Sequence, residues 1–235
     1  MRQPHFTIYA FSMAVLALLA AQSCSLYQPH MTTVPLLKSK GEVMVEGSLA
    51  FPFNAAPSMN LSVSAAPANH LAVQAYGSFT NDSNNYAQGA VGMFFPTVRN
   101  TVLELYAGFG YGSSNSNQNS SNSSRSSSYN DVCYGYYRIF FGQLNYGWRD
   151  LGKVDLGFGI KVGGLYPSFT QYDFNLQQHT NELTNPQLFV EPLFLFRVGG
   201  EYTKFTLQMG YTTLHFHDPF ELSHFSISTG VQLRF

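Results

Sequence analysis

Apolar and polar residues alternate along most of the chain after about residue 40. In the last twelve residues, one face would carry Phe225, Ile227, Thr229, Val231, Leu233 and Phe235, and the other Ser226, Ser228, Gly230, Gln232 and Arg234. This period of two is typical of a β-strand with one apolar and one polar face. Since the strand ends the chain on an aromatic residue, it favours the closing strand of a transmembrane β-barrel.

The whole pattern predicts an all-β fold, a transmembrane up-and-down antiparallel β-barrel of about ten strands. The alternating segments are 41–51, 58–66, 70–80, 86–95, 101–112, 129–145, 154–172, 187–203, 205–214 and 224–235. Short and longer connections alternate between them, as expected for short periplasmic turns and long extracellular loops. With an even number of strands, both termini are expected in the periplasm.

Charged residues of these segments nearly all share the polar face. They are Glu42, Glu46, Glu104, Asp155, Lys161, Glu191, Arg197, Glu201 and Arg234. We expect them to pair inside the lumen, since a cation on the lipid face near the midplane costs about 2–4 kcal/mol. In segment 129–145, Arg138 and Gln143 have opposite parity, which predicts a β-bulge between them. The same inner face carries glycines, which favour an open lumen, whereas paired charges favour a closed one. These glycines are Gly157, Gly159, Gly163 and Gly210.

Aromatic residues gather near both ends of the strands, where a barrel carries two interfacial girdles. The outer girdle is predicted from Tyr86, Tyr111, Tyr129, Tyr166 and Tyr211, and the periplasmic girdle from Phe95, Tyr146, Trp148, Tyr202, Phe205 and Phe235. Charged residues make up 11% and aromatic residues 16% of the chain, which fits a barrel better than a soluble enzyme. The net charge of -1 excludes an electrostatic case for nucleic-acid binding.

The amino-terminal residues have the pattern of an export signal. Arg2 precedes an apolar run from Ile8 to Ala21, and the run 19–24 places Cys24 after a small residue, as in a bacterial lipoprotein cleavage site. We therefore expect a cleaved lipoprotein signal peptide at 1–23, a lipidated periplasmic tether at 24–40 and the barrel at 41–235. The alternative is a plain signal peptide cut near Ser23. If Cys24 carries lipid, Cys133 has no disulfide partner and is expected to pack as a small apolar residue.

Three stretches near the start of the chain resemble a known family. They are Tyr27-Gln28-Pro29-His30, Val34-Pro35-Leu36-Leu37-Lys38-Ser39-Lys40-Gly41-Glu42 and Asn69-His70-Leu71-Ala72-Val73-Gln74-Ala75. Together they are similar to small outer-membrane β-barrel lipoproteins of Bacteroidota. The resemblance implies a barrel fold, palmitate-type lipidation at Cys24 and an outer-membrane location, but no particular activity. A terminal aromatic such as Phe235 is, in outer-membrane proteins of this kind, the signal for barrel assembly.

Two loops carry unusual composition. Residues 113–128 form a tract rich in Ser and Asn, which is expected to be disordered at the cell surface because it cannot bury apolar surface. The last outer loop holds His215, His217 and Asp218, which are weak candidates for a divalent metal site. Spacing of i, i+2 alone is little support for such a site, so we expect neither a metal nor another cofactor.

Three classes of function fit this sequence. The leading one is a structural or interaction role, as an accessory subunit of a larger outer-membrane complex. Its partners would be outer-membrane lipid, the barrel-assembly and lipoprotein-sorting machinery, and other outer-membrane proteins. The alternatives are a narrow pore for small solutes and an outer-membrane enzyme of the omptin type. Because the sequence shows no nucleophile motif and no second acidic pair at the outer end, we do not expect an enzyme.

Overall fold

The computed structural model describes residues 27, 30, 33–53, 55–80, 84–97, 100–120, 129–173, 178–214 and 223–235. Their strands are β1 (Val43–Pro52), β2 (Ser58–Ala68), β3 (Leu71–Thr80), β4 (Asn85–Pro96), β5 (Thr101–Ser120), β6 (Tyr129–Leu151), β7 (Val154–Asp173), β8 (Gln178–Leu183), β9 (Gln187–Gly199), β10 (Thr203–Tyr211) and β11 (Phe225–Arg234). No helix in these ranges is both long and apolar enough to cross a membrane.

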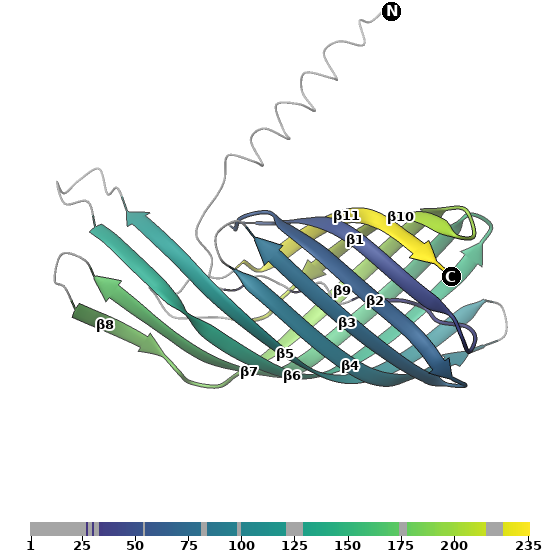
Figure 1. Cartoon of the computed structure of the whole chain (residues 1–235), viewed down its shortest axis with the longest axis horizontal. Coiled ribbons are helices and arrows are strands. Elements are labelled where there is room, and N and C mark those ends of the chain that lie inside the picture. Colours follow the sequence, from purple (N-terminus) through teal and green to yellow (C-terminus); the bar gives the residue numbers. More distant parts are fainter. Residues whose placement is uncertain are drawn as a thin grey trace, which may run out of the picture.

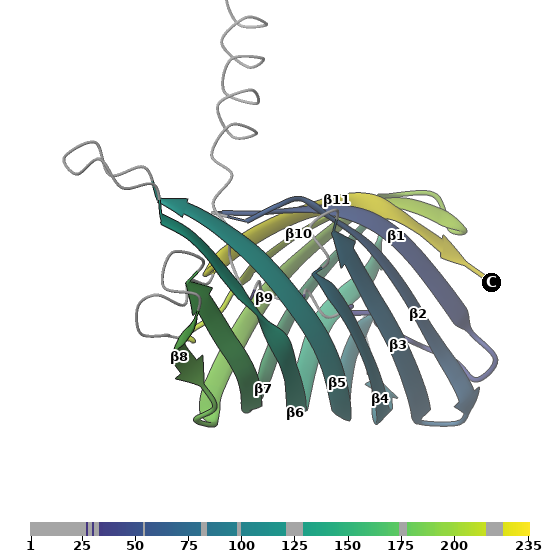
Figure 2. The ribbon, with the colours of Figure 1, turned by 60° about the vertical axis from the view of Figure 1, so that its left-hand side comes forward.

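Ten of the described strands form a closed antiparallel barrel, as predicted (Figure 1). Each strand pairs with its neighbour in the chain, except that β7 pairs with β9, and β1 pairs with β11 to close the ring. Closure leaves no strand edge of the ring unpaired, so that its backbone polar groups are satisfied within the wall. The strands cross the barrel at a tilt, which is visible in Figure 2.

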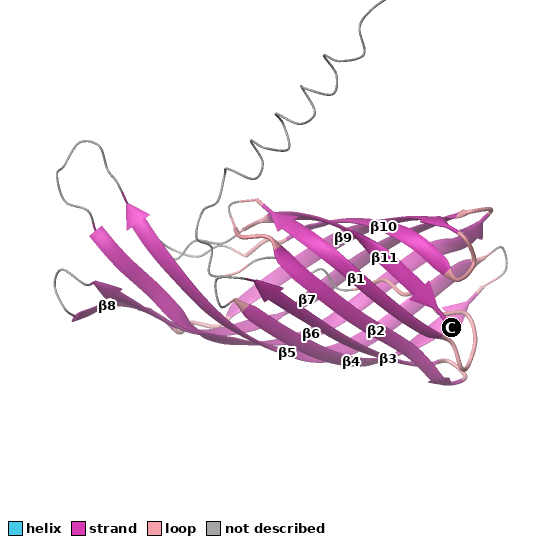
Figure 3. Cartoon of the chain, turned by 45° about the horizontal axis from the view of Figure 1, so that its top comes forward, coloured by secondary structure: helices cyan, strands magenta, loops and turns pink. Residues whose placement is uncertain are grey.

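At one end the wall continues beyond the ring. β7 leaves β9 after the pair Leu165–Gln187 and then pairs with β8, while β6 stays paired with β7 up to Asp173. β5, β6, β7 and β8 therefore form a four-stranded projection at the long-loop end, as Figure 3 shows. The opposite end, which holds Phe235 and the short turns, is called the short-turn end below.

The predicted faces of the strands are confirmed. In β10, Phe205 and Tyr211 are outward and exposed, whereas Thr206 and Gln208 are inward and buried. The same alternation runs through β7 and β11. Girdle residues that remain exposed on the outer surface include Tyr111, Tyr166 and Tyr211 at the long-loop end and Phe95, Tyr146, Tyr202, Phe205 and Phe235 at the short-turn end. The outer surface is thus apolar with aromatic ends, as a lipid-facing surface requires.

The bulge predicted between Arg138 and Gln143 does not exist. The register of β6 is regular against both β5 and β7 through this stretch, so that Gln143 is inward and Arg138 outward. Arg138 lies opposite Tyr111 on one neighbouring strand and Tyr166 on the other. A long cationic side chain between two girdle tyrosines can reach the polar interface, where its cost falls to about 0–1 kcal/mol.

Three further predictions about single residues or segments are wrong. Tyr86 faces the lumen, where it is 2% exposed, and does not belong to the outer girdle. Glu201 lies exposed in the turn between β9 and β10, so it is not a lumen charge. The Ser/Asn-rich tract is not wholly loop, because 113–120 continue β5 and pair with 129–136 of β6. Main-chain pairing with a neighbouring strand orders this polar stretch without burying apolar surface.

Candidate functional site in the barrel lumen

The lumen is occupied by the segment that was expected to be a periplasmic tether. All five residues from 33 to 37 are buried inside the barrel, and so are Tyr27 and His30. Val34, Leu36 and Leu37 have no exposed surface at all. We call residues 27–38 the plug, of which the structure describes Tyr27, His30 and 33–38. The plug is the feature that distinguishes this barrel from an empty pore.

Wall side chains hold the plug by its main chain. Four of its carbonyl oxygens accept hydrogen bonds from inward residues: that of His30 from Lys161 Nζ (2.9 Å), Thr33 from Gln143 Nε2 (3.2 Å), Val34 from Arg197 Nη1 (2.9 Å) and Leu36 from Arg149 Nη1 (3.0 Å). In the other direction, the main-chain N–H of Leu37 donates to Glu104 Oε1 at 2.7 Å. Without these side chains, the main-chain groups would be buried with no hydrogen-bond partner among them, which is costly in the interior.

The order of these contacts gives the direction of the plug. Along β6, which runs from the long-loop end to the short-turn end, His30 contacts Tyr137, Thr33 contacts Gln143 and Leu36 contacts Arg149. Along β9, which runs the same way, Tyr27 donates to Glu191 and Val34 accepts from Arg197. The plug therefore descends through the lumen from the long-loop end at Tyr27 to the short-turn end at Lys38.

Inward glycines make room for the plug, not for a channel. A Cβ on Gly157 would lie 3.1 Å from Val34 Cγ1, and one on Gly159 would lie 3.2 Å from Val34 Cγ2. A Cβ on Gly147 would lie 2.9 Å from the methyl carbons of Leu36. Gly157 and Gly159, two of the four glycines of the predicted open lumen, thus form with Gly147 the hollow that receives the apolar side chains of the plug.

One residue of the plug has a main-chain conformation that its side chain disfavours. Leu36 has a φ of 58°, in the left-handed region, which costs a residue with a Cβ about 1–2 kcal/mol. Such a conformation persists only where surrounding contacts determine it. Here the Arg149 hydrogen bond and the hollow at Gly147 supply those contacts, which indicates a fitted segment and not a loosely inserted one.

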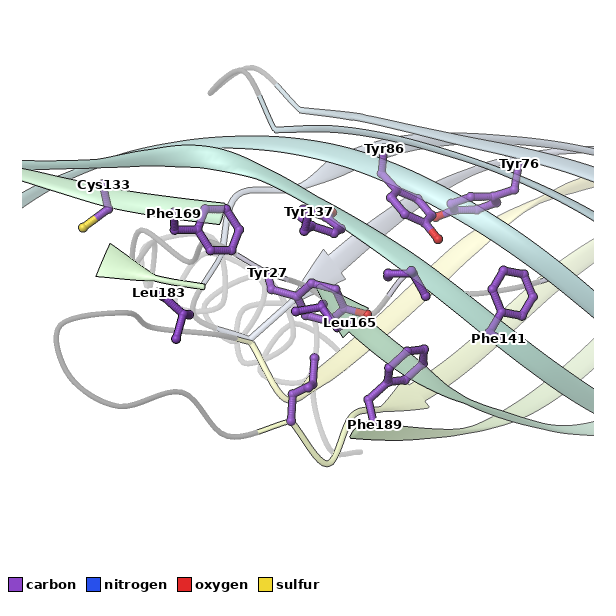
Figure 4. Packing of buried hydrophobic residues seen from close by; sticks show 12 residues of the cluster. Tyr27, Tyr76, Tyr86, Cys133, Tyr137, Phe141, Leu165, Phe169, Leu183 and Phe189 are labelled. Atoms are coloured by element: carbon purple, nitrogen blue, oxygen red, sulfur yellow. The ribbon is translucent and has the colours of Figure 1, made fainter. Parts of the chain in front are cut away.

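Aromatic side chains enclose the plug at the long-loop end (Figure 4). The His30 ring stacks on Tyr86 with ring centres 3.5 Å apart, and the Tyr27 ring meets Tyr137 edge to face. Tyr27 also donates its hydroxyl to Glu191 at 2.6 Å and accepts the N–H of Ser223 on its main-chain carbonyl at 2.9 Å. Cys133 lies farther out in the same buried cluster with Phe169 and Leu183, where it packs as a small apolar residue.

Ion pairs line the interior around the plug. Arg197 on β9 contacts Glu46 on β1 at 2.8 Å, and Lys161 on β7 contacts Glu191 on β9 at 2.6 Å. Both pairs are buried, and their cations also hold plug carbonyls. The predicted pairing of lumen charges is therefore present, with a role that the sequence did not reveal.

Two lumen cations were missed because they were assigned to turns. Arg149 binds Glu42 at 2.6 Å, and Lys204 binds Asp155. Both continue the inward parity of their strands, since Arg149 follows Gln143 and Asn145 on β6 and Lys204 precedes Thr206 and Gln208 on β10. That parity could have identified both residues as lumen cations. The two pairs form a charged layer below the plug at the short-turn end.

The cavities of the barrel are consistent with a lumen filled by the plug. A cavity in the middle of the lumen, lined by His30, Gln143, Lys161 and Glu191 among others, measures about 10 Å³, which is room for about one water molecule. A vestibule of about 770 Å³ opens at the short-turn end and is lined by Lys40, Glu42, Arg149, Lys204 and Arg234 among others. The charged layer forms the floor of this vestibule.

The predicted site residues fall in different places. Cys24 and the metal candidates His215, His217 and Asp218 lie outside the described residues, and no group of metal ligands occurs within those that are described. Phe235 follows β11 at the short-turn end, where its main chain exchanges two hydrogen bonds with Val43 of β1. The carboxyl-terminal residue therefore takes part in the seam that closes the barrel.

No protein-family model and no curated protein matches the chain. Among solved structures, it is similar to the outer membrane protease OmpT from Escherichia coli, with a TM-score of 0.58, 11% identity, and coverage of 83% of this chain and 93% of that one. This chain has the fold of an outer-membrane β-barrel. The translocator domain of the autotransporter NalP from Neisseria meningitidis also matches, with a TM-score of 0.41, 13% identity, and coverage of 97% and 99%. The KdgM porin follows at a TM-score of 0.38, 10% identity, and coverage of 83% and 99%.

Proposed function

We propose that this protein is an outer-membrane β-barrel lipoprotein that is closed by its own plug and acts through contacts with other proteins, as an accessory subunit of a larger outer-membrane assembly. The observation that carries the proposal is the filled lumen. Five hydrogen bonds between wall side chains and the plug main chain, together with the glycine hollow, support a permanent plug. A solute pore would need that space free.

The projection at the long-loop end supports the interaction role. β5, β6, β7 and β8 extend past the ring and carry exposed tyrosines, Tyr134 and Tyr136, on their outer face. Tyrosine is enriched where proteins bind one another, because it combines a large apolar ring with a hydrogen-bonding hydroxyl. The projection thus offers a surface for a partner above the plane of the membrane.

Planar-bilayer conductance tests the closed barrel. The purified protein should show little steady conductance, and a variant without residues 26–37 should conduct, because the deletion empties the lumen while the wall strands stay intact. Both proteins should give the heat-modifiable gel band of a folded barrel. Steady conductance of the unmodified protein at the level of the deletion variant would favour the narrow pore instead.

Purification from native membranes tests the interaction role. The intact protein should recover other outer-membrane proteins in fixed ratio, and Tyr134→Ser with Tyr136→Ser should lose them while keeping the folded band. We also propose that the protein has no catalytic activity, so incubation with mixed peptides should give no cleavage. Cleavage that disappears in a His217→Ala variant would overturn that part of the proposal and favour the omptin-type alternative.

A further inference from the structure

The plug places the two ends of the described chain at opposite ends of the barrel. The Tyr27 hydroxyl donates to Glu191 inside the lumen, and its main-chain carbonyl accepts the N–H of Ser223, which precedes β11 at the long-loop end. Phe235 lies at the short-turn end (Figure 1). This arrangement differs from the expectation that both termini lie on one side of the membrane.

The position of Tyr27 limits where Cys24 can be. Only Ser25 and Leu26 lie between them, and a fully extended chain spans about 3.3–3.6 Å per residue, or about 10 Å over the three steps. The hydrocarbon core of a bilayer is about 30 Å thick. Cys24 therefore cannot return to the short-turn end while Tyr27 holds its contacts.

We propose that the lipidated amino terminus emerges at the long-loop end, so that the acyl chains of Cys24 anchor in the outer leaflet and the first residues of the mature protein are displayed on the cell surface. The inference deepens the proposed function, since it rests on lipidation of Cys24 and on long loops that face outward. It reverses the expected site of the lipid, from the inner to the outer leaflet.

Chemistry at the plug supports this arrangement over a loose tether. Among the described plug residues, Tyr27, His30, Thr33, Val34, Leu36 and Lys38 each hydrogen-bond a buried side chain of the lumen. A tether that served only to reach an inner-leaflet lipid would have no need of buried partners. The lumen instead provides hydrogen-bond donors for four of its carbonyl groups.

Epitope accessibility on intact cells tests the location of the terminus. One short epitope is inserted after Ser25, the same epitope at Ser121 reports the long loops, and a third at Lys153 reports the short turns. Antibody should bind the first two on intact cells and the third only after the outer membrane is permeabilised. The heat-modifiable band of each variant shows that the barrel has folded.

The pattern of failures separates the proposals. If the Ser121 epitope is accessible and the Ser25 epitope is not, the surface terminus is wrong, while closure of the lumen remains testable by conductance. If Lys153 is accessible and Ser121 is not, the barrel has the opposite orientation and the surface location fails with it.

A second experiment follows the lipid itself. A protease site inserted after Ser25 should be cut by protease added to intact cells that carry radiolabelled palmitate. The palmitate label in the gel band of the barrel should then fall at least ten-fold, whereas the same site inserted at Lys153 should leave the label unchanged. Label retained after complete cutting would show that lipid is attached elsewhere, and failure to cut would show that the terminus is not outside.

Discussion

The Arg197–Glu46 pair offers the sharpest test of the packed lumen, because the Arg197 side chain contacts both β1, through Glu46, and the plug, through Val34. Arg197 is 0% exposed; its Nη2 lies 2.8 Å from Glu46 Oε2 and its Nη1 donates to the Val34 carbonyl at 2.9 Å. Arg197→Met would leave a buried carboxylate without its counter-ion. Removal of one partner from a buried pair costs about 3–5 kcal/mol.

We expect the lower end of that range. Glu46 would keep Gln208 Nε2 and Thr206 Oγ1 as donors, which lessens the penalty, whereas loss of the bond to Val34 adds about 1 kcal/mol. A loss of about 3 kcal/mol shifts the unfolding equilibrium by about 100-fold.

Urea unfolding of the refolded protein in lipid vesicles measures this effect. The fluorescence of Trp148, the single tryptophan of the chain, and the heat-modifiable gel band report unfolding independently. Arg138→Met is the matched control, since Arg138 is exposed on the outer face, and should change stability by no more than about 0.5 kcal/mol. Arg197→Met with Glu46→Gln should recover much of the loss, because no buried charge is then left alone. Equal stability of Arg197→Met and Arg138→Met would refute the reasoning and show that water fills the lumen.

Other predictions concern the plug and its anchor. Val34→Cys with Gly157→Cys, in a Cys133→Ala background, should form a disulfide during export, because a Cβ on Gly157 lies 3.1 Å from Val34 Cγ1. After the chain is cut between the two positions, the fragments should migrate together in a non-reducing gel. Gly157→Val should displace the plug and raise conductance, because a Cβ there already lies 3.1 Å from Val34 Cγ1. Gly47→Val, at a position with no atom within 4 Å of the added Cβ, should do neither. Equal conductance of the two variants would argue against the glycine hollow. Cys24→Ala should abolish palmitate labelling yet leave the protein in the outer membrane, since the barrel is anchored by its strands; unchanged labelling would remove the lipoprotein assignment.

The alternation of the strands was sufficient to predict the ring, because each face of a transmembrane strand meets only one environment. The errors arose where that rule weakens. Arg138 violates strict parity and is tolerated between two tyrosines near the interface, so the inferred bulge was unnecessary. In the projection of β5 to β8, the stretch 113–120 of β5 consists of Ser, Asn and Gln alone, so that no apolar residue marks either of its faces. Polar residues of 113–120 consequently gave no strand signal.

The plug was missed for a different reason. A segment that lies inside a lumen follows no period, since its surroundings differ on every side. One signal was nevertheless present: Val34-Pro35-Leu36-Leu37 is an apolar run in a stretch that was expected to be in water. Together with the small inward residues Gly147, Gly157 and Gly159, it could have suggested that the run fills the hollow.

The direction of the plug also constrains how the barrel is made. Its central residues precede β1 in the chain and are joined to it by the short stretch 39–42. The described part of this segment hydrogen-bonds inward side chains of four strands, β5, β6, β7 and β9. We therefore expect the wall to assemble around the segment, so that Glu104 of β5, Gln143 of β6, Lys161 of β7 and Arg197 of β9 contact it before β1 and β11 close the ring. In that order of events the plug adds to the strand register that the alternating faces already specify, because a slip of one residue would turn every one of these side chains toward lipid.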